Sequence, residues 1–288
     1  MVVTGAGGMV GREVTKFCHA SGDTVVAYDH CGLDIGDAGA VSKALRESKP
    51  SVVINCAAWT DVDGCERDKE RAFAANARGP ENLANACHEI NATLVTISTD
   101  YVFDGTKEGF YTQDDQPNPE SIYGLSKLEG ERCAQSAHPR TVIVRTGFIF
   151  GTDGSNFLST VVDRARRGEK IKAIADAYGT PTYARDLAVR LRELAQLNHP
   201  GVFHVANAGT GVSYEQFASE AVRIAGCVGV EVEGVQMDSL KRPAPRPRNS
   251  RLSCLYSDAL GLPPLPDWRE ALREFVRDHK NGRFPLCY

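Results

Sequence analysis

A tyrosine and a lysine stand four residues apart in the segment Tyr123-Gly-Leu-Ser-Lys127. A helix is predicted over this segment, so both side chains should point to one face. A free phenol has a pKa of about 10, and an ammonium a few ångströms away would lower that pKa toward neutral. Tyr123 could then donate a proton to a carbonyl oxygen while a hydride reaches the carbon. The spacing alone is weak evidence, because such pairs also arise by chance.

A third group, the hydroxyl of Thr99, lies at the end of a strand predicted over residues 93–98. There it is expected to polarise the same carbonyl, while Lys127 also holds the ribose of a nicotinamide nucleotide. Thr99, Tyr123 and Lys127 could therefore act on one carbonyl group. The alternative is that Thr99 and Asp100 form a turn or helix cap, and that Tyr101 is a packing aromatic.

A glycine cluster, Gly5-Ala-Gly-Gly-Met-Val-Gly11, separates the first predicted strand from the first predicted helix. Glycines permit a sharp turn and a close approach to a pyrophosphate, which the amides at the helix N-terminus would hold. Asp29 closes the second predicted strand, where a carboxylate would accept from a ribose diol and repel a 2′-phosphate. Asp29 thus favours NADH, whereas Arg12 favours NADPH, because a guanidinium can pair with the 2′-phosphate. We expect NADH or NADPH, with a slight preference for NADH; the alternative is a purely structural turn.

The elements that must position these groups alternate between short β-branched runs and longer amphipathic stretches. This alternation is typical of an α/β fold with a doubly wound parallel sheet of the Rossmann type. Strands are expected over residues 1–4, 24–28, 52–55, 93–98 and 141–145. Helices are expected over 11–20, 38–48, 65–77, 80–91 and 121–137, with a break at Gly79-Pro80.

The second half of the chain is less regular. Helices are expected over 156–167, 185–197 and 214–225 and from residue 267 onward, with a strand over 201–205. Residues 241–250, the basic loop, are rich in proline and arginine and should be extended. We expect a dinucleotide-binding domain over 1–150. Residues 151–288 should complete the sheet and form a small substrate-binding lobe, with a ligand cleft between lobe and strand ends.

The composition narrows the functional classes. The 288 residues carry 33 Lys and Arg against 37 Asp and Glu, a net charge of −4 that lacks the basic footprint of a nucleic-acid binder. The apolar runs are strand-sized, so no membrane span is expected. The nine cysteines show no ligand spacing, which predicts reduced thiols and no metal site. With no secretory signal recognised, we expect a cytoplasmic protein, and the sequence is compatible with a homodimer.

Two longer segments carry a specific resemblance: Ser98-Thr-Asp-Tyr-Val-Phe-Asp-Gly105 and Tyr123-Gly-Leu-Ser-Lys-Leu-Glu-Gly-Glu131. With the glycine cluster, they resemble the extended short-chain dehydrogenase/reductase superfamily and, within it, the dTDP-4-dehydrorhamnose reductase family. The segments 55–61, 145–146, 178–182 and 246–252 match as well, so the resemblance runs nearly end to end. It implies that Thr99, Tyr123 and Lys127 form a catalytic triad.

The resemblance also implies binding residues, to which we add the outer glycines of the cluster. The expected cofactor-binding residues are Gly5, Gly8, Met9, Val10, Gly11, Asp29, Asp34, Ile35, Ala57, Ala58, Tyr123 and Lys127. Substrate contacts are implied at Asp100 and Tyr101. Phe148 is expected to form an apolar wall where the family usually has a tryptophan. Arg246, Asn249 and Arg251 are candidates for a diphosphate. Trp59, where relatives often carry a histidine, would line the site or merely pack.

The implied activity is NAD(P)H-dependent reduction of the C4 ketone of a nucleotide-linked 4-keto-6-deoxy sugar, with dTDP-4-dehydro-L-rhamnose as the first choice. Tyr101 favours reduction over dehydration, because related sugar-nucleotide dehydratases carry at this position a glutamate that removes a proton from the sugar. Two alternatives stay open. One is a non-catalytic nucleotide-binding regulatory subunit resembling the methionine adenosyltransferase beta subunit, although such a role puts no demand on the triad. The other is a reductase or epimerase of another nucleotide sugar.

Overall fold

The computed structural model describes residues 1–281 with the exception of 153, 155 and 198. A six-stranded parallel sheet forms its centre, with the strand order β10-β5-β4-β3-β1-β2. The chain order reverses between β1 and β3, where open α/β sheets bind their ligands. The strands are β1 (Val2–Thr4), β2 (Val26–Tyr28), β3 (Val52–Asn55), β4 (Thr93–Thr99), β5 (Thr141–Thr146) and β10 (Gly201–His204).

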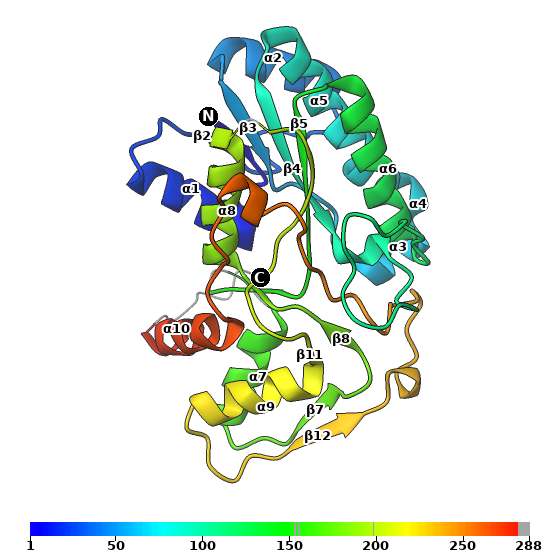
Figure 1. The fold of residues 1–288 in the computed structure, drawn as a ribbon, viewed down its shortest axis with the longest axis vertical. Coiled ribbons are helices and arrows are strands. Elements are labelled where there is room, and N and C mark those ends of the chain that lie inside the picture. The colour runs from blue at the N-terminus through cyan, green and yellow to red at the C-terminus, as the bar shows by residue number, and fades with distance from the viewer. Residues whose placement is uncertain (153, 155, 198, 282–288) are drawn as a thin grey trace.

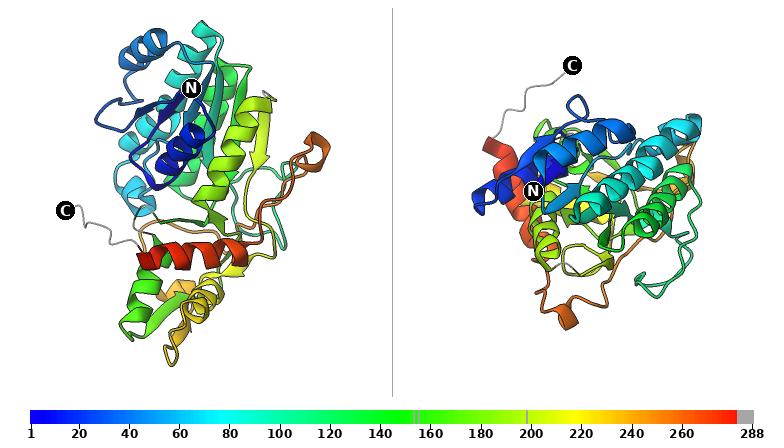
Figure 2. Two further views of the ribbon diagram at one scale, coloured as in Figure 1. Left: turned by 90° about the vertical axis from the view of Figure 1, so that its left-hand side faces the viewer. Right: turned by 90° about the horizontal axis from the view of Figure 1, so that it is seen from above.

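Helices cover both faces of this sheet, which explains why the central strands β4 and β5 are buried almost throughout. On one face lie α1 (Met9–Ala20) and α8 (Ala184–Leu197), which pack against each other. On the other lie α2 (Ala38–Ser48), α5 (Gly79–Ile90) and α6 (Ile122–Ala137) (Figures 1 and 2). Helices α5 and α8 turn an apolar stripe toward the strands, with Leu83 and Leu191 fully buried. Helix α6 differs, because its buried face includes the polar Ser126, Lys127 and Glu131.

A smaller lobe lies beyond the carboxyl ends of the strands (Figure 1). Its own core gathers around Phe150, Phe217 and Phe275, whose rings meet edge to face. The lobe's helices are α7 (Phe157–Arg166), α9 (Tyr214–Ile224) and α10 (Trp268–Asn281). Its short strands are β6 (Ile149–Phe150), β7 (Ile171–Ile174), β8 (Tyr178–Gly179), β9 (Thr182–Tyr183), β11 (Val212–Ser213) and β12 (Val232–Val235).

Two expectations about helices are wrong. The helix expected over 65–77 is divided into α3 (Val62–Arg67) and α4 (Lys69–Phe73), because the Asp68 side chain accepts from the Arg71 amide and caps α4. No break occurs at Gly79-Pro80: the π-helical turn η1 (Ala74–Arg78) leads directly into α5. A widened turn tolerates a proline that has no amide hydrogen to donate.

The other expected strands and helices are present, with ends shifted by one to a few residues. The strand expected over 201–205 joins the sheet beside β5, and the basic loop contains no helix. Sequence reasoning missed the short strands of the lobe and three 3₁₀ turns, η2 (Asp100–Val102), η3 (Met237–Ser239) and η4 (Asp258–Leu260). None of the helices in the described part of the chain combines the length and apolarity needed to cross a bilayer.

Candidate active site

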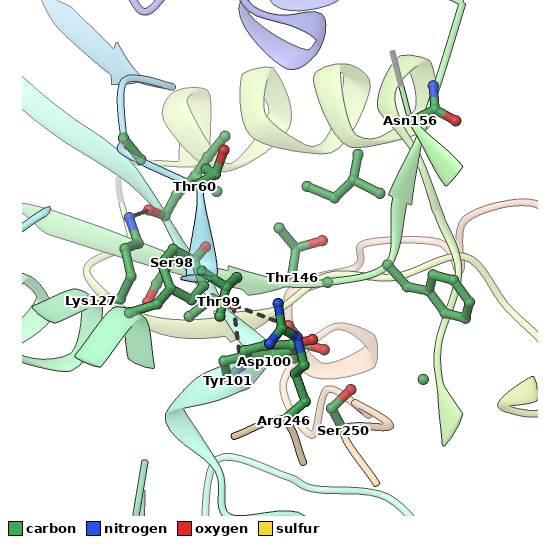
Figure 3. A pocket seen from close by; sticks show the side chains of 18 of the residues that line it. Thr60, Ser98, Thr99, Asp100, Tyr101, Lys127, Thr146, Asn156, Arg246 and Ser250 are labelled. Atoms are coloured by element: carbon green, nitrogen blue, oxygen red, sulfur yellow. Dashed lines mark hydrogen bonds between the residues drawn. The ribbon is translucent and has the colours of Figure 1, made fainter. Parts of the chain in front are cut away.

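A cavity of about 480 Å³, here the central cavity, opens where the lobe faces the carboxyl ends of the strands. Side chains from β4, η2, α6 and the basic loop converge on it (Figure 3). Its lining includes Gly8–Gly11, Cys56–Ala58, Ile97–Tyr101, Tyr123, Lys127, Thr146–Ile149, Tyr178, Tyr214, Met237, Arg242, Arg246 and Ser250. The structure therefore brings the three expected catalytic residues to one cavity.

A second cavity of about 760 Å³, the glycine-side cavity, lies next to the first. The two share Gly8 and residues 56–58, so they form one groove across the point where the strand order reverses. Expected cofactor-binding residues line one cavity or the other: Gly8, Met9, Val10, Gly11, Ala57, Ala58, Tyr123 and Lys127 the central cavity, and Gly5, Gly8, Asp29, Asp34, Ile35, Ala57 and Ala58 the glycine-side cavity.

The glycine turn is shaped to receive a pyrophosphate. Gly5 adopts a φ of 67°, and a Cβ there would lie 2.5 Å from the Ala57 amide nitrogen. A Cβ on Gly11 would overlap the Gly5 carbonyl. Helix α1 begins at Met9 with Gly8 as N-cap, and Gly8 offers no side chain to bond the amides of the first turn. These amides therefore remain available to an anion, and the turn fits a dinucleotide.

The far end of the glycine-side cavity carries groups of both charges. Asp29 follows β2, and its Oδ1 accepts from the Gly32 amide at 2.8 Å. Arg12 is exposed and lies outside the residues that line either cavity. Sequence reasoning missed Arg71 and Arg78, which reach this cavity from α4 and η1 with no signal in their spacing. The Arg71 guanidinium stacks on Trp59, 4.5 Å from the ring centroid, so Trp59 lines the site. These residues fit NADH or NADPH.

Thr99 caps the turn η2, which begins at Asp100, and both residues line the central cavity. The Thr99 hydroxyl accepts from the Tyr101 amide at 3.2 Å and donates to Asp100 Oδ1 at 3.0 Å. Burial raises the pKa of the Asp100 carboxyl to about 6, although hydrogen bonds from Ser250 and Thr99 oppose the shift. A Cβ on Gly147 would overlap this carboxyl group, so only glycine fits beside it.

Tyr123 and Lys127 share one face of α6, as expected, and both line the central cavity. The start of α6 is fixed twice, because the Ser121 side chain accepts from the Gly124 amide and Glu66 accepts from the Ile122 amide. The Lys127 ammonium donates to the Ile97 carbonyl at 2.7 Å. Helix and strand thus hold the two side chains at the same cavity wall.

The expected lowering of the Tyr123 pKa by Lys127 is wrong for the protein alone. Burial raises the pKa of the Tyr123 phenol above its ordinary value, an effect that nearby Thr99 opposes only in part. The charge of Asp100 also raises this pKa, while the Lys127 ammonium donates to the Ile97 carbonyl. Burial lowers the pKa of Lys127 itself to about 8, against the opposing charge of Glu131. At neutral pH both groups keep their protons.

A buried ion pair joins α6 to β5. Arg145 of β5 donates to Glu131 of α6 through Nε at 2.9 Å and Nη2 at 2.7 Å, and Ser98 of β4 donates to the same carboxylate. Sequence reasoning gave Glu131 no role. Its position four residues after Lys127, on the same helix face, was the available signal.

The expected substrate-side residues Asp100, Tyr101, Phe148 and Arg246 surround the central cavity. The Tyr101 ring meets that of Tyr123 edge to face, with centroids 5.9 Å apart. Phe148 adopts a left-handed φ of 50° and packs on Tyr214 at 4.2 Å, so the turn after β5 aims the ring at the cavity.

Asn249 and Arg251 do not line the cavity, and this corrects the expectation that they contact a diphosphate. Asn249 Nδ2 donates to the carbonyls of Lys107 and Gly109, and Arg251 Nε donates to Asn249 Oδ1 at 2.7 Å. These bonds fix the end of the basic loop instead. Arg242, passed over in the sequence, lines the cavity beside Arg246. Among the described residues, no three His, Cys, Asp or Glu side chains gather to hold a metal ion.

Comparison with known proteins gives consistent matches. A family model described as the RmlD substrate binding domain matches residues 1–281. A dTDP-4-dehydrorhamnose reductase of Mycolicibacterium smegmatis is 42% identical over 279 residues, 96% of this chain and 84% of that protein. The structure of a dTDP-4-dehydrorhamnose reductase from Clostridium acetobutylicum has a TM-score of 0.93 at 38% identity, covering 97% of this chain and 99% of that one. A Bacillus anthracis dTDP-4-dehydrorhamnose reductase in complex with NADP has a TM-score of 0.92 at 33% identity, covering 96% and 98%.

Proposed function

The chain belongs to the dTDP-4-dehydrorhamnose reductase family, and on that premise we propose that it reduces the C4 ketone of a nucleotide-linked 4-keto-6-deoxy sugar with NADH or NADPH. The favoured reaction converts dTDP-4-dehydro-L-rhamnose to dTDP-L-rhamnose. One observation carries the proposal. Thr99, Tyr123 and Lys127 line a cavity that runs without interruption into the glycine turn.

Tyr123 is the proposed acid. Its raised pKa keeps the phenol protonated at neutral pH, as a group that gives a proton to a carbonyl oxygen requires. Thr99 is the proposed second donor to that oxygen, its hydroxyl turning from Asp100 toward the ligand. Bound NADH or NADPH supplies the hydride for the carbon. Lys127 is proposed to bind the cofactor's ribose. This is supported by its position in the same cavity as Ala57, Ala58 and the glycine turn.

The walls of the central cavity suit a nucleotide sugar. Phe148 offers an apolar face, Asp100 and Tyr101 offer polar atoms, and Arg246 offers a guanidinium for an anionic diphosphate. Tyr101 in place of a glutamate leaves no strong base at that position. Burial raises the pKa of the Tyr101 phenol well above its ordinary value, which supports reduction rather than loss of water.

We also propose a cytoplasmic location and a division of labour along the chain. The eight cysteines that the structure describes carry free thiols, the state that a reducing compartment maintains. Residues 1–150 would bind the dinucleotide, while 151–288 supply β10 to the sheet and the lobe that faces the substrate. A homodimer stays a prediction from the sequence.

The test is turnover of a panel of nucleotide keto-sugars by the purified protein with NADH or NADPH. We expect dTDP-4-dehydro-L-rhamnose to oxidise the reduced nicotinamide in step with the appearance of dTDP-L-rhamnose. A reaction without the keto-sugar is the control. Interconversion of sugars with no net cofactor oxidation would identify an epimerase, and no oxidation with any member of the panel would contradict the proposal.

A further inference from the structure

The basic loop borders the substrate side of the central cavity, to which it contributes Arg242, Arg246, Pro247 and Ser250. The loop forms no helix or regular strand, so its own backbone hydrogen bonds do not fix it. Its place must instead depend on contacts with other elements. The contact that reaches Arg246 comes from Asp63, on the short helix α3 of the sheet domain.

Asp63 holds both the backbone and a side chain of the loop. Its Oδ1 accepts from the Ala244 amide at 3.1 Å and from Arg246 Nη1 at 2.7 Å. Arg246 Nη1 also donates to the Ala244 carbonyl at 2.8 Å, which closes a small ring of bonds. The hydrogen bond from Arg246 lowers the pKa of the Asp63 carboxyl to about 2, so the pair stays ionised in any ordinary assay.

The guanidinium of Arg246 keeps donors for a ligand. Both of its hydrogen bonds run through Nη1, and within the described part of the chain none uses Nη2 or Nε. The side chain is mostly buried and extends from the loop toward Asp100 and Tyr101 (Figure 3). Asp63 therefore aims the free side of a planar, fork-shaped donor at the cavity.

The same helix also secures the catalytic acid. Glu66 Oε1 accepts at 2.8 Å from the amide of Ile122, the residue that precedes Tyr123. Asp61 caps α3 by accepting from the Gly64 amide at 2.8 Å. Helix α3 thus links the basic loop to the start of α6 through two carboxylates one turn apart.

We propose that Asp63 is a positioning residue for substrate binding: it holds Arg246 and the basic loop in register with Tyr123. Arg246 then binds the diphosphate of the nucleotide sugar while the keto carbon lies at the acid. The inference rests on the proposed function for the identity of this ligand.

Asp63 could instead simply neutralise the charge of Arg246, and that role predicts the opposite change in substrate affinity when Asp63 is removed. If only charge mattered, removing the carboxylate would leave a more positive cavity, and an anionic substrate would bind more tightly. If position matters, the freed arginine and loop must be ordered by the substrate, and binding weakens. The direction of the change in KM decides between them.

The experiment compares Asp63→Asn with the wild-type enzyme in steady-state kinetics. We expect the KM for the nucleotide sugar to rise about ten- to hundredfold, the scale of a lost charged hydrogen bond. The KM for NADPH should be unchanged and kcat should fall much less than kcat/KM. Asp63→Glu, which keeps the charge, should restore part of the affinity. An unchanged or lower KM for the sugar in Asp63→Asn would overturn the inference.

A matched control is Asp23→Asn, which breaks the Asp23–Arg192 pair (Oδ2 to Nε, 2.6 Å) away from both cavities. That pair is as shielded as Asp63–Arg246, with side chains 22% and 19% exposed against 28% and 14%. Asp23→Asn is expected to leave the KM for the sugar unchanged. An equal rise in the KM for the sugar in both variants would show that Asp63 acts only through the general stability of the protein, and would overturn the inference.

Hydrogen exchange separates this inference from the proposed function. If the wild-type protein turns over no keto-sugar, the proposed function fails. The positioning role of Asp63 can still be tested, by hydrogen exchange at the Ala244 amide and by binding of dTDP. We expect Asp63→Ala to exchange this amide faster and to bind dTDP more weakly than wild type. Unchanged exchange would overturn the positioning role whatever the activity.

Discussion

The roles proposed for Tyr123 and Lys127 depend on which protons these two side chains hold. Burial acts in opposite directions on the two groups of α6: it raises the pKa of the Tyr123 phenol and lowers that of the Lys127 ammonium to about 8. Tyr123 therefore keeps its proton at neutral pH, as the proposed acid must, and Lys127 still carries its charge. The Ile97 carbonyl that holds Lys127 fixes the cation in place before any cofactor binds.

Replacing Tyr123 by Phe tests this assignment at the level of one atom. Phenylalanine keeps the ring that packs on Tyr101 but removes the proton donor. We expect kcat to fall about 10²- to 10⁴-fold, with little change in the KM for the sugar. Exposed Tyr256, which lies outside the cavity lining, provides the control Tyr256→Phe. A Tyr123→Phe enzyme that keeps more than about a tenth of wild-type kcat would exclude Tyr123 as the acid.

Among the elements, the parallel register of β4 and β5 decides the shape of the site. Thr99 of β4 lies directly beside Thr146 of β5, so the next residues, Asp100 and Gly147, meet as the strands end. Gly147 leaves the space that the Asp100 carboxyl occupies, and Phe148 then turns left-handed into the cavity. Two adjacent strand ends thus place an acid and an aromatic wall together.

Gly147→Ala should break this arrangement. The added methyl overlaps the Asp100 carboxyl, so we expect a loss of about 1–3 kcal/mol in unfolding free energy and a lower kcat/KM. Urea denaturation measures the first and steady-state assays the second. Gly39→Ala on α2 is the control, because its Cβ would lie 3.3 Å from its nearest neighbour, Asp37 Oδ1. A Gly147→Ala protein as stable and active as wild type would refute the steric argument.

For the molecule as a whole, the buried site is a cost to folding. The Asp100 carboxyl has a pKa of about 6 in the folded protein against 3.8 ordinarily, so the folded state binds its proton more tightly than the unfolded state does. The protonated Asp100 carboxyl therefore stabilises the folded state at low pH, and this stabilisation is lost as the pH rises through about 6. Above that pH the charged carboxylate stays buried at the expense of stability.

Asp100→Asn removes this charge while keeping the side chain's shape. We compare the unfolding free energy of the variant with that of the wild type at each pH. We expect this difference to be about 2 kcal/mol more in favour of the variant at about pH 7.5 than at about pH 4.5. Urea denaturation of both proteins at each pH measures the gain, and Asp114→Asn, at an exposed position, controls for loss of one surface charge. Equal differences between Asp100→Asn and wild type at the two pH values would contradict the buried-charge argument.

The sequence by itself determined the features that depend on local spacing. A glycine turn between a strand and a helix, a tyrosine and lysine on one helix face, and a loop rich in proline each follow from short-range geometry. Together with the longer motifs around Thr99 and Tyr123, these patterns were enough to identify the family. They misled in two places: the Asp68 cap divides the helix expected over 65–77, and at Gly79-Pro80 a π turn carries the helix through the proline.

Only the tertiary structure decided the proton states and the long-range partners. No local pattern indicates that Asp63 reaches Arg246 across 183 positions. Nor does one indicate that Asn249 bonds the carbonyls of Lys107 and Gly109 while Arg251 bonds Asn249. Nor does the Tyr123–Lys127 spacing reveal that a carbonyl from β4 holds the ammonium. The physical reason is that pKa values and side-chain partners depend on burial and on atoms brought together by folding, and sequence distance does not measure either.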